Sequence, residues 1–243
     1  MTRNGKLVGV GVGPGDPELM TLKAARALAD ASVVAYFAKA GKGSNARRIV
    51  EGHLKPSVTE LPLLYPVTTE IAKSAPAYDE AIGDFFDAAA ANIARHLDAG
   101  QFVAVLSEGD PFFYGSYMHV HKRLSPHYPT EVIAGVTSLS GCWSAAGTPI
   151  AQGDDVLTVL PGTLPEDELA RRLSGTDAAV VIKLGRNLGK VRRALVNARR
   201  LERAIYVERG TMADAAIMPL ADKLDDVAPY FAVVLIPGFA ARP

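Results

Sequence analysis

Short apolar runs alternate with amphipathic segments along the 243-residue chain, and this pattern leaves few fold classes open. Residues 6–12 and 102–106 form apolar runs bounded by glycine or polar residues, as buried strands are. Residues 78–97 carry apolar side chains at spacings of three and four, which predicts a long helix ended by Gly100. Such alternation predicts an α/β fold with mainly parallel strands.

The number of expected strands indicates two α/β domains rather than one. Near the N-terminus, a strand, a helix over 17–29 with Asp16 as N-cap, and a strand over 32–36 form a β-α-β unit. Expected strands and helices continue to alternate, as shorter segments, up to a last strand over residues 231–236. We therefore expect an N-terminal domain over residues 1–115, which holds a glycine-rich loop, and a C-terminal domain over residues 116–243.

Composition excludes several classes of protein. Lys plus Arg and Asp plus Glu each number 26, and this zero net charge argues against a sequence-independent nucleic-acid binder. The one cysteine, Cys142, excludes an internal disulfide and a cysteine-cluster metal site, and its small apolar neighbours predict a buried, inert thiol. His119 and His121 would point to different helix faces, so we expect no metal site.

No signal peptide and no apolar run of roughly 18 residues is found, so we expect a cytoplasmic protein without a membrane partner.

Four glycines alternate between residues 9 and 15, where the first expected strand turns into a helix. Such a turn lets backbone N–H groups approach a ligand closely. In the dinucleotide-binding motif G-x-G-x-x-G, two residues separate the last two glycines, whereas here only Pro14 separates Gly13 from Gly15. Pro14 also lacks the backbone N–H that could donate to a pyrophosphate. Tyr36 and Phe37 also stand where that motif requires an acidic residue. These departures weigh against a nucleotide-dependent oxidoreductase, and a tight turn without a ligand is the other reading.

Residues 108–115 form a second informative loop, at the carboxyl end of an expected strand. Ligands bind at such ends in open α/β sheets. Asp110 can accept a hydrogen bond from a ligand, and Phe113 and Tyr114 offer apolar surface to a flat one. The simpler interpretation is that Asp110 only caps the segment that starts at Pro111.

Residues 10–24 and 108–115 together resemble the tetrapyrrole (corrin and porphyrin) methyltransferases. Further motifs follow in the expected order, at residues 134–138, 147–150, 183–186 and 208–211. The resemblance spans essentially the whole chain. It implies two α/β domains with S-adenosylmethionine in the cleft between them, S-adenosylhomocysteine as product, and a homodimer.

Within this family, residues 36–39, 44–47 and 63–70 most resemble the branch that methylates precorrin-2 at C20 to give precorrin-3A in cobalamin synthesis. Phe37 stands where the uroporphyrinogen-III methyltransferases carry an aspartate. The branch that acts on the cobalt-containing substrate is very similar, so the metal status of the substrate stays open. Same-fold relatives acting on diphthamide precursors or ribosomal RNA, and a non-catalytic ligand-binding protein, are further alternatives.

The resemblance also implies which residues contact the cofactor. Pro14 would lie under it, Glu108, Gly109, Asp110 and Phe113 around its methionine and ribose, Thr137 and Ser138 near its carboxylate or amine, and Leu184 and Gly210 along its adenine. Relatives often carry glycine at the position of Glu108.

The implied substrate carries several carboxylates, so a chain without net charge must gather positive charge locally. Lys39 and Arg47 lie around a loop that follows an expected strand, and Arg186 follows another. We expect these three to bind substrate carboxylates. Lys42 and Arg48 could equally belong to a solvated loop.

An activated methyl group needs alignment rather than a metal or a nucleophilic triad. Methylation at carbon must end with loss of a proton or a shift of the conjugated system. Lys183 ends an apolar strand, so it either extends to solvent or faces the cleft, where desolvation would suit it to proton transfer. Tyr36 is a candidate for contact with the macrocycle, and otherwise a core residue.

Overall fold

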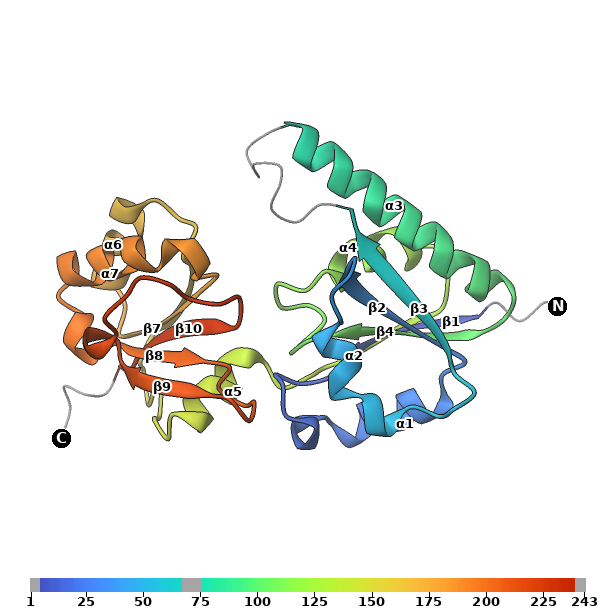
Figure 1. The fold of residues 1–243 in the computed structure, drawn as a ribbon, viewed down its shortest axis with the longest axis horizontal. Coiled ribbons are helices and arrows are strands. Elements are labelled where there is room, and N and C mark those ends of the chain that lie inside the picture. The colour runs from blue at the N-terminus through green and yellow to red at the C-terminus, as the bar shows by residue number, and fades with distance from the viewer. Residues whose placement is uncertain (1–4, 67–75, 239–243) are drawn as a thin grey trace. The chain divides into compact units, whose positions relative to one another are not determined.

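The computed structural model describes residues 5–66 and 76–238 and divides the chain into two units (Figure 1). The first unit runs to Thr137 and the second begins at Ser138, and each contains a five-stranded sheet flanked by helices. The prediction of two α/β domains is therefore confirmed. Their division lies later than the expected boundary after residue 115, because the strand over Thr130–Ile133 pairs with the first strand of the chain.

The sheet of the first unit is entirely parallel. Its strands are β1 (Lys6–Gly11), β2 (Val33–Lys39), β3 (Thr59–Tyr65), β4 (Phe102–Ser107) and β5 (Thr130–Ile133), in the order β3-β2-β4-β1-β5. Parallel strands end at the same edge of a sheet, so the loops after β1, β4 and β5 meet there. This is the edge to which the sequence assigned the cofactor loops.

Helices cover both faces of this sheet. They are α1 (Leu22–Asp30), α2 (Asn45–Ile49), α3 (Pro76–Asp98) and α4 (Tyr117–Leu124), with short 3₁₀ turns at Pro17–Leu19 and Glu51–His53. Successive strand residues point to opposite faces. α1 and α2 lie on one side of the sheet and α3 and α4 on the other (Figure 1). Val8, Val34 and Leu106 pack with α1 and α2, whereas Leu7 and Val105 pack with α3 and α4.

The first predicted helix is two elements. Asp16 accepts a hydrogen bond from the Glu18 N–H at 2.9 Å, as an N-cap does, but it caps only the 3₁₀ turn that starts at Pro17. α1 itself starts at Leu22 and is capped by Thr21, whose hydroxyl accepts from the Ala24 N–H at 3.1 Å. Two good caps in succession divide what the apolar spacing alone presents as one helix.

The second unit has a mixed sheet. Its elements are α5 (Ser138–Ala145), β6 (Leu157–Pro161), α6 (Glu166–Ser174), β7 (Ala178–Ile182), α7 (Leu188–Asn197), β8 (Ile205–Glu208), β9 (Ala216–Pro219) and β10 (Ala232–Ile236), with 3₁₀ turns at Gly185–Asn187, Leu201–Arg203 and Leu220–Asp222. The strand order is β6-β7-β10-β8-β9, and only β6 and β7 pair in parallel. The expectation of mainly parallel strands is wrong here, because the chain after β8 carries no crossover helix.

The core of the second unit lies between its helices and its sheet. Leu169 of α6 and Val191 of α7 pack against Val181 and Val234 of the two central strands. Cys142 of α5 is 7% exposed, and burial raises the pKa of its thiol to about 11. The prediction that this thiol is buried is confirmed, and its raised pKa is consistent with low reactivity. Among the described residues no helix is long and apolar enough to cross a membrane.

Candidate functional site

The loops that follow β1 and β4 contact each other directly. Gly13 and Gly109 form an antiparallel bridge, in which the Gly109 N–H donates to the Gly13 carbonyl at 2.8 Å. Both residues have positive φ angles, 83° and 66°, which glycine adopts without strain. Pro14 follows directly and is half-buried. The structure thus brings Pro14 and Gly109, both predicted cofactor residues, to one edge of the sheet.

Asp110 attaches a third loop to this junction. Its Oδ2 accepts a hydrogen bond from the Gly135 N–H at 3.1 Å, in the loop after β5. Its Oδ1 accepts from the Phe112 N–H at 2.9 Å. Asp110 therefore does more than cap its own loop, since it ties the loops after β4 and β5 together. Each oxygen keeps a second lone pair for a ligand donor.

Glu108 points toward α2. The Ala46 N–H at the start of α2 donates to its carboxylate, and Arg48 of the same helix lies close enough to favour the charged form. Burial nevertheless dominates and raises the pKa of the Glu108 carboxyl from 4.5 to about 7. This carboxyl therefore changes its protonation near neutral pH.

The raised pKa of Glu108 predicts a pH dependence of stability. Between pH 4.5 and about 7 the folded chain holds a proton that the unfolded chain has lost, so stability falls as the pH rises through this window. The loss at Glu108 amounts to up to about 3 kcal/mol. We expect Glu108→Gln to remove this slope in urea unfolding, while the exposed control Glu51→Gln keeps it. Equal slopes in Glu108→Gln and the parent protein would contradict the assignment.

Tyr36, Arg47 and Glu60 form a hydrogen-bonded cluster on the α2 side of the sheet. The Tyr36 hydroxyl donates to Glu60 Oε2 at 2.9 Å, and Arg47 binds both oxygens of Glu60 through Nε and Nη2 at 2.8 Å each. The bond from Arg47 is the main cause of a lowered pKa at Glu60, and burial is the main cause of a raised pKa at Tyr36. The Tyr36 hydroxyl is a hydrogen-bond donor here rather than a base.

Sequence reasoning did not identify Glu60. The register of β2 and β3 pairs Val34 with Glu60 and Tyr36 with Pro62, which places Tyr36 diagonally across from Glu60 on one face. Leu61 and Leu63 pack on the face covered by α3 and α4, so strand alternation puts Glu60 on the face covered by α1 and α2. The sequence carries no signal for the register between the two strands.

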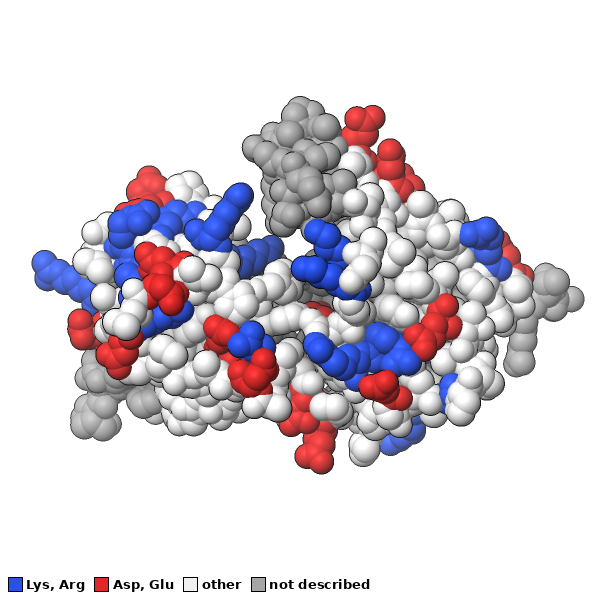
Figure 2. Space-filling model, viewed as in Figure 1, with Lys and Arg blue, Asp and Glu red and all other residues white. Residues whose placement is uncertain are grey.

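Basic side chains gather over α2, as Figure 2 shows. Ser44 caps this short helix by accepting a hydrogen bond from the Arg47 N–H at 3.4 Å. Lys39, the last residue of β2, is half-buried and already has an interaction partner. Lys39 and Arg47 therefore both belong to the first unit, and Arg47 is partly committed to Glu60.

The second unit has its own cluster of predicted residues at one edge of its sheet. β7 and β8 run in the same direction, because β10 between them is antiparallel to both, so Lys183 and Arg209 follow their strands at the same edge. Their φ angles are 58° and 50°. Such backbone strain costs about 1–3 kcal/mol for a non-glycine residue and is frequent at functional sites.

The predicted site residues at this edge of the second sheet differ in which of their atoms a ligand could contact. Lys183 and Arg186 are exposed, so the burial on which a proton-transfer role for Lys183 depends is absent within the unit. The Leu184 side chain is 0% exposed in the core, which leaves only its backbone to face a ligand. Gly210 packs closely, since a Cβ there would lie 2.8 Å from Val207 Cγ1 and 3.1 Å from Cys142 Sγ.

Thr211 carries an unsatisfied polar atom beside Gly210. Its Oγ1 is buried and has no hydrogen-bond partner. An unpaired buried hydroxyl costs about 1–3 kcal/mol, which a polar ligand group would recover. The sequence placed Thr211 within a family motif without assigning it a role. This orphaned hydroxyl fits a polar heterocycle such as adenine at the place where the resemblance puts it.

The remaining predicted cofactor residues lie in the loop after β4 and on either side of the division between the two units. Phe113 is half-buried and its ring meets Tyr114 edge-on at 4.9 Å. Thr137 is half-buried at the end of the first unit and already has an interaction partner. Ser138 is exposed at the start of α5. Their assigned contacts with a cofactor stay predictions.

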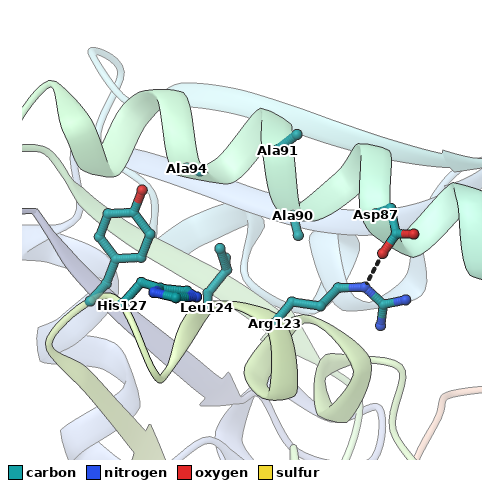
Figure 3. Close-up of a pocket in the computed structure, with 8 residues that line it drawn as sticks. Asp87, Ala90, Ala91, Ala94, Arg123, Leu124 and His127 are labelled. Atoms are coloured by element: carbon teal, nitrogen blue, oxygen red, sulfur yellow. Dashed lines mark hydrogen bonds and ion pairs between the residues drawn. The ribbon is translucent and has the colours of Figure 1, made fainter.

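A shallow groove of about 280 Å³ lies between α3 and α4 (Figure 3). Its lining consists of Asp87, Ala90, Ala91, Ala94, Arg123, Leu124, His127 and Tyr128. An ion pair between Arg123 Nε and Asp87 Oδ1, 2.5 Å long, closes one end (Figure 3). The groove contains none of the predicted site residues, so we do not assign it to the candidate site. Across the described ranges no group of three His, Cys, Asp or Glu residues could hold a metal ion.

Comparison with known proteins gives concordant matches. The family model for the tetrapyrrole (corrin/porphyrin) methylases matches residues 6–226. A precorrin-2 C(20)-methyltransferase from Sinorhizobium sp is 62% identical over 239 residues, which covers 98% of each chain. A cobalt-precorrin-2 C(20)-methyltransferase from Salmonella typhimurium is 26% identical and covers 96% of each chain. The structure of a uroporphyrin-III C-methyl transferase from Thermus thermophilus, complexed with S-adenyl homocysteine, aligns with a TM-score of 0.66 at 26% identity, covering 95% of this chain and 97% of that one.

Proposed function

Since this chain belongs to the tetrapyrrole (corrin/porphyrin) methylases, we propose that it transfers the methyl group of S-adenosylmethionine to C20 of precorrin-2 in cobalamin biosynthesis. The observation that carries this proposal is the 62% identity, over 98% of both chains, to a precorrin-2 C(20)-methyltransferase. The relative named for the cobalt-containing substrate is 26% identical, which favours metal-free precorrin-2.

S-adenosylmethionine supplies an activated methyl group when it is bound. We assign its binding to Pro14, Gly109 and Asp110 in the first unit, and to the Leu184 backbone and Gly210 in the second. The backbone of the Gly13–Gly109 bridge and the unsatisfied Thr211 hydroxyl support this assignment. The chain's task is then to hold the acceptor carbon in line with the methyl group and to exclude water, which can lower the barrier by several kcal/mol.

Cationic side chains bind the substrate in this proposal. The pair with Glu60 uses Nε and Nη2 of Arg47, so Nη1 lies outside it and can donate to a substrate carboxylate. Lys39, at the carboxyl end of β2, and Arg186, shortly after the end of β7, are assigned the same role. Tyr36 stays a candidate for contact with the macrocycle. Lys183, predicted as a proton-transfer residue, is exposed within the second unit and is not assigned that role here.

Arg47→Ala is expected to raise the KM for the tetrapyrrole about 10-fold, because one charge-assisted hydrogen bond to a carboxylate is lost. The kcat and the affinity for S-adenosylmethionine should not change. Lys122→Ala, which removes an exposed positive charge on α4, is the matched control and should leave KM unaltered. An unchanged KM in Arg47→Ala would remove Arg47 from the substrate site.

The function itself is tested with purified protein, S-adenosylmethionine and enzymatically made precorrin-2 under anaerobic conditions, with and without cobalt. Mass spectrometry and NMR should show one added methyl group, at C20. Binding of S-adenosylmethionine without methylation of either substrate form would overturn the substrate assignment and leave the family assignment intact.

Compartment and assembly belong to the proposal as well. We expect a homodimer, which the family resemblance implies, and a cytoplasmic location, in line with the sequence patterns described above. Light scattering of the purified protein should give twice the chain mass of 25.7 kDa, and a monomer at micromolar concentration would contradict the expected dimer.

A further inference from the structure

Methylation at a ring carbon leaves a proton to be removed, and this inference rests on the proposed function. A carbon–methyl bond forms at C20, and the S–CH₃ bond breaks with its electron pair left on sulfur. C20 then carries both hydrogen and methyl, and the macrocycle holds one extra positive charge. Loss of the C20 hydrogen as a proton returns its bonding pair to the conjugated system, so the reaction needs a base and no oxidant.

We propose that the Glu108 carboxylate accepts this proton. Glu108 follows β4 directly, on the same side of the sheet as Ala104 and Leu106, which face α1 and α2. Its neighbour Gly109 is bonded to the loop after β1, and Asp110 is bonded to the loop after β5. The Glu108 carboxyl reaches the first turn of α2. It therefore lies between the loops assigned to the cofactor and the helix that carries Arg47.

The surroundings of Glu108 suit a base that works near neutral pH. Burial raises its pKa to about 7, while the Ala46 N–H and the positive charge of Arg48 keep the ionised form accessible. Other charged groups on the packed elements face elsewhere. Arg47 is held by Glu60, and Asp16 accepts from the Glu18 N–H. A catalytic base is most effective when its pKa is close to the working pH.

The neighbouring candidates are less suited to accept a proton. The Tyr36 hydroxyl is the donor in a hydrogen bond to Glu60, so its oxygen is still protonated. Glu60 is bound on both oxygens by Arg47, which lowers its pKa and its basicity. Both oxygens of Asp110 accept backbone N–H groups. Lys183 is exposed in the second unit.

The test compares the parent enzyme, Glu108→Gln, Glu108→Asp and the exposed control Glu51→Gln, with precorrin-2 carrying deuterium at C20. In Glu108→Gln we expect kcat to fall at least about 100-fold, with loss of the rise in rate through neutral pH and a new primary deuterium isotope effect. A methylated species that still carries hydrogen at C20 should accumulate and absorb at shorter wavelength. Glu108→Asp should restore part of the rate and the pH-dependent rise, which a purely structural role would not.

One further measurement makes the outcome decisive. Carboxyl infrared titration of the free protein should lose one group titrating near neutrality in Glu108→Gln and keep it in Glu51→Gln. Parent-like rate, pH profile and isotope effect in Glu108→Gln would overturn the inference while the methyltransferase function stands. A parent enzyme that does not methylate precorrin-2 would overturn both.

Discussion

Replacing Gly135 with alanine is expected to abolish stable folding of the first unit. A Cβ at this position would lie 2.0 Å from the Gly109 carbonyl oxygen and 2.9 Å from backbone carbons of Gly11. These are backbone atoms of the loop after β4 and of the end of β1, so no side chain can turn away to make room. Overpacking usually costs about 1–3 kcal/mol, and we expect more than about 4 kcal/mol here because the backbone must move. Urea unfolding and the yield of folded protein measure the effect.

Gly83→Ala is the matched control for this prediction. Gly83 lies within α3, and a Cβ there would meet nothing within 4 Å. Alanine is favoured over glycine in a helix by about 1 kcal/mol, so this variant should be slightly more stable than the parent. A Gly135→Ala protein with the parent's urea midpoint would show that the three loops do not meet as closely as described.

Asp110→Ala should produce the second-largest effect, because one side chain supplies two of the bonds that hold the loop junction. The Gly135 and Phe112 N–H groups would both lose their acceptor. Hydrogen bonds to a charged group contribute about 1.5–3 kcal/mol each, so we expect a loss of about 3 kcal/mol in the free energy of unfolding. The affinity for S-adenosylmethionine should fall at least about 10-fold, measured by calorimetry, since the binding loops lose their mutual order.

Asp110→Asn separates the two bonds. The asparagine oxygen can still accept from the Phe112 N–H, but its NH₂ group would face the Gly135 N–H, where two donors meet. The expected loss of stability is about half that of the alanine variant or somewhat more. If the alanine and asparagine variants both unfold like the parent, Asp110 does not organise the junction.

Much of the first unit could be predicted, because its signals are local. The apolar runs gave β1, β2 and β4 close to their observed bounds. Asp16 acts as the predicted N-cap, and the glycine-rich turn after β1 is present with Gly13 at positive φ. Such features depend on the residue type and its immediate neighbours, which the sequence displays directly.

The predictions that differ from the structure concern features that depend on pairing between segments far apart in the sequence. The division of the chain was expected too early, because nothing in residues 116–137 shows that β5 will pair with β1. The second sheet was expected to be mainly parallel, but β10 enters between β7 and β8 in the opposite direction. The turn after β7 directs the Leu184 side chain into the core, so the predicted contact of Leu184 with the cofactor falls to its backbone, which the sequence did not show.

The sequence by itself determined the α/β class, the loops at strand ends and the resemblance to one family, since these depend on local residue order. Only the tertiary structure decided that Glu60 joins Tyr36 to Arg47, through a strand register that no local signal specifies. It also decided that the half-buried Glu108 carboxyl packs against α2, where partial desolvation raises its pKa to about 7. A side chain's protonation depends on the dielectric and charges around it, and segments far away in the chain supply those.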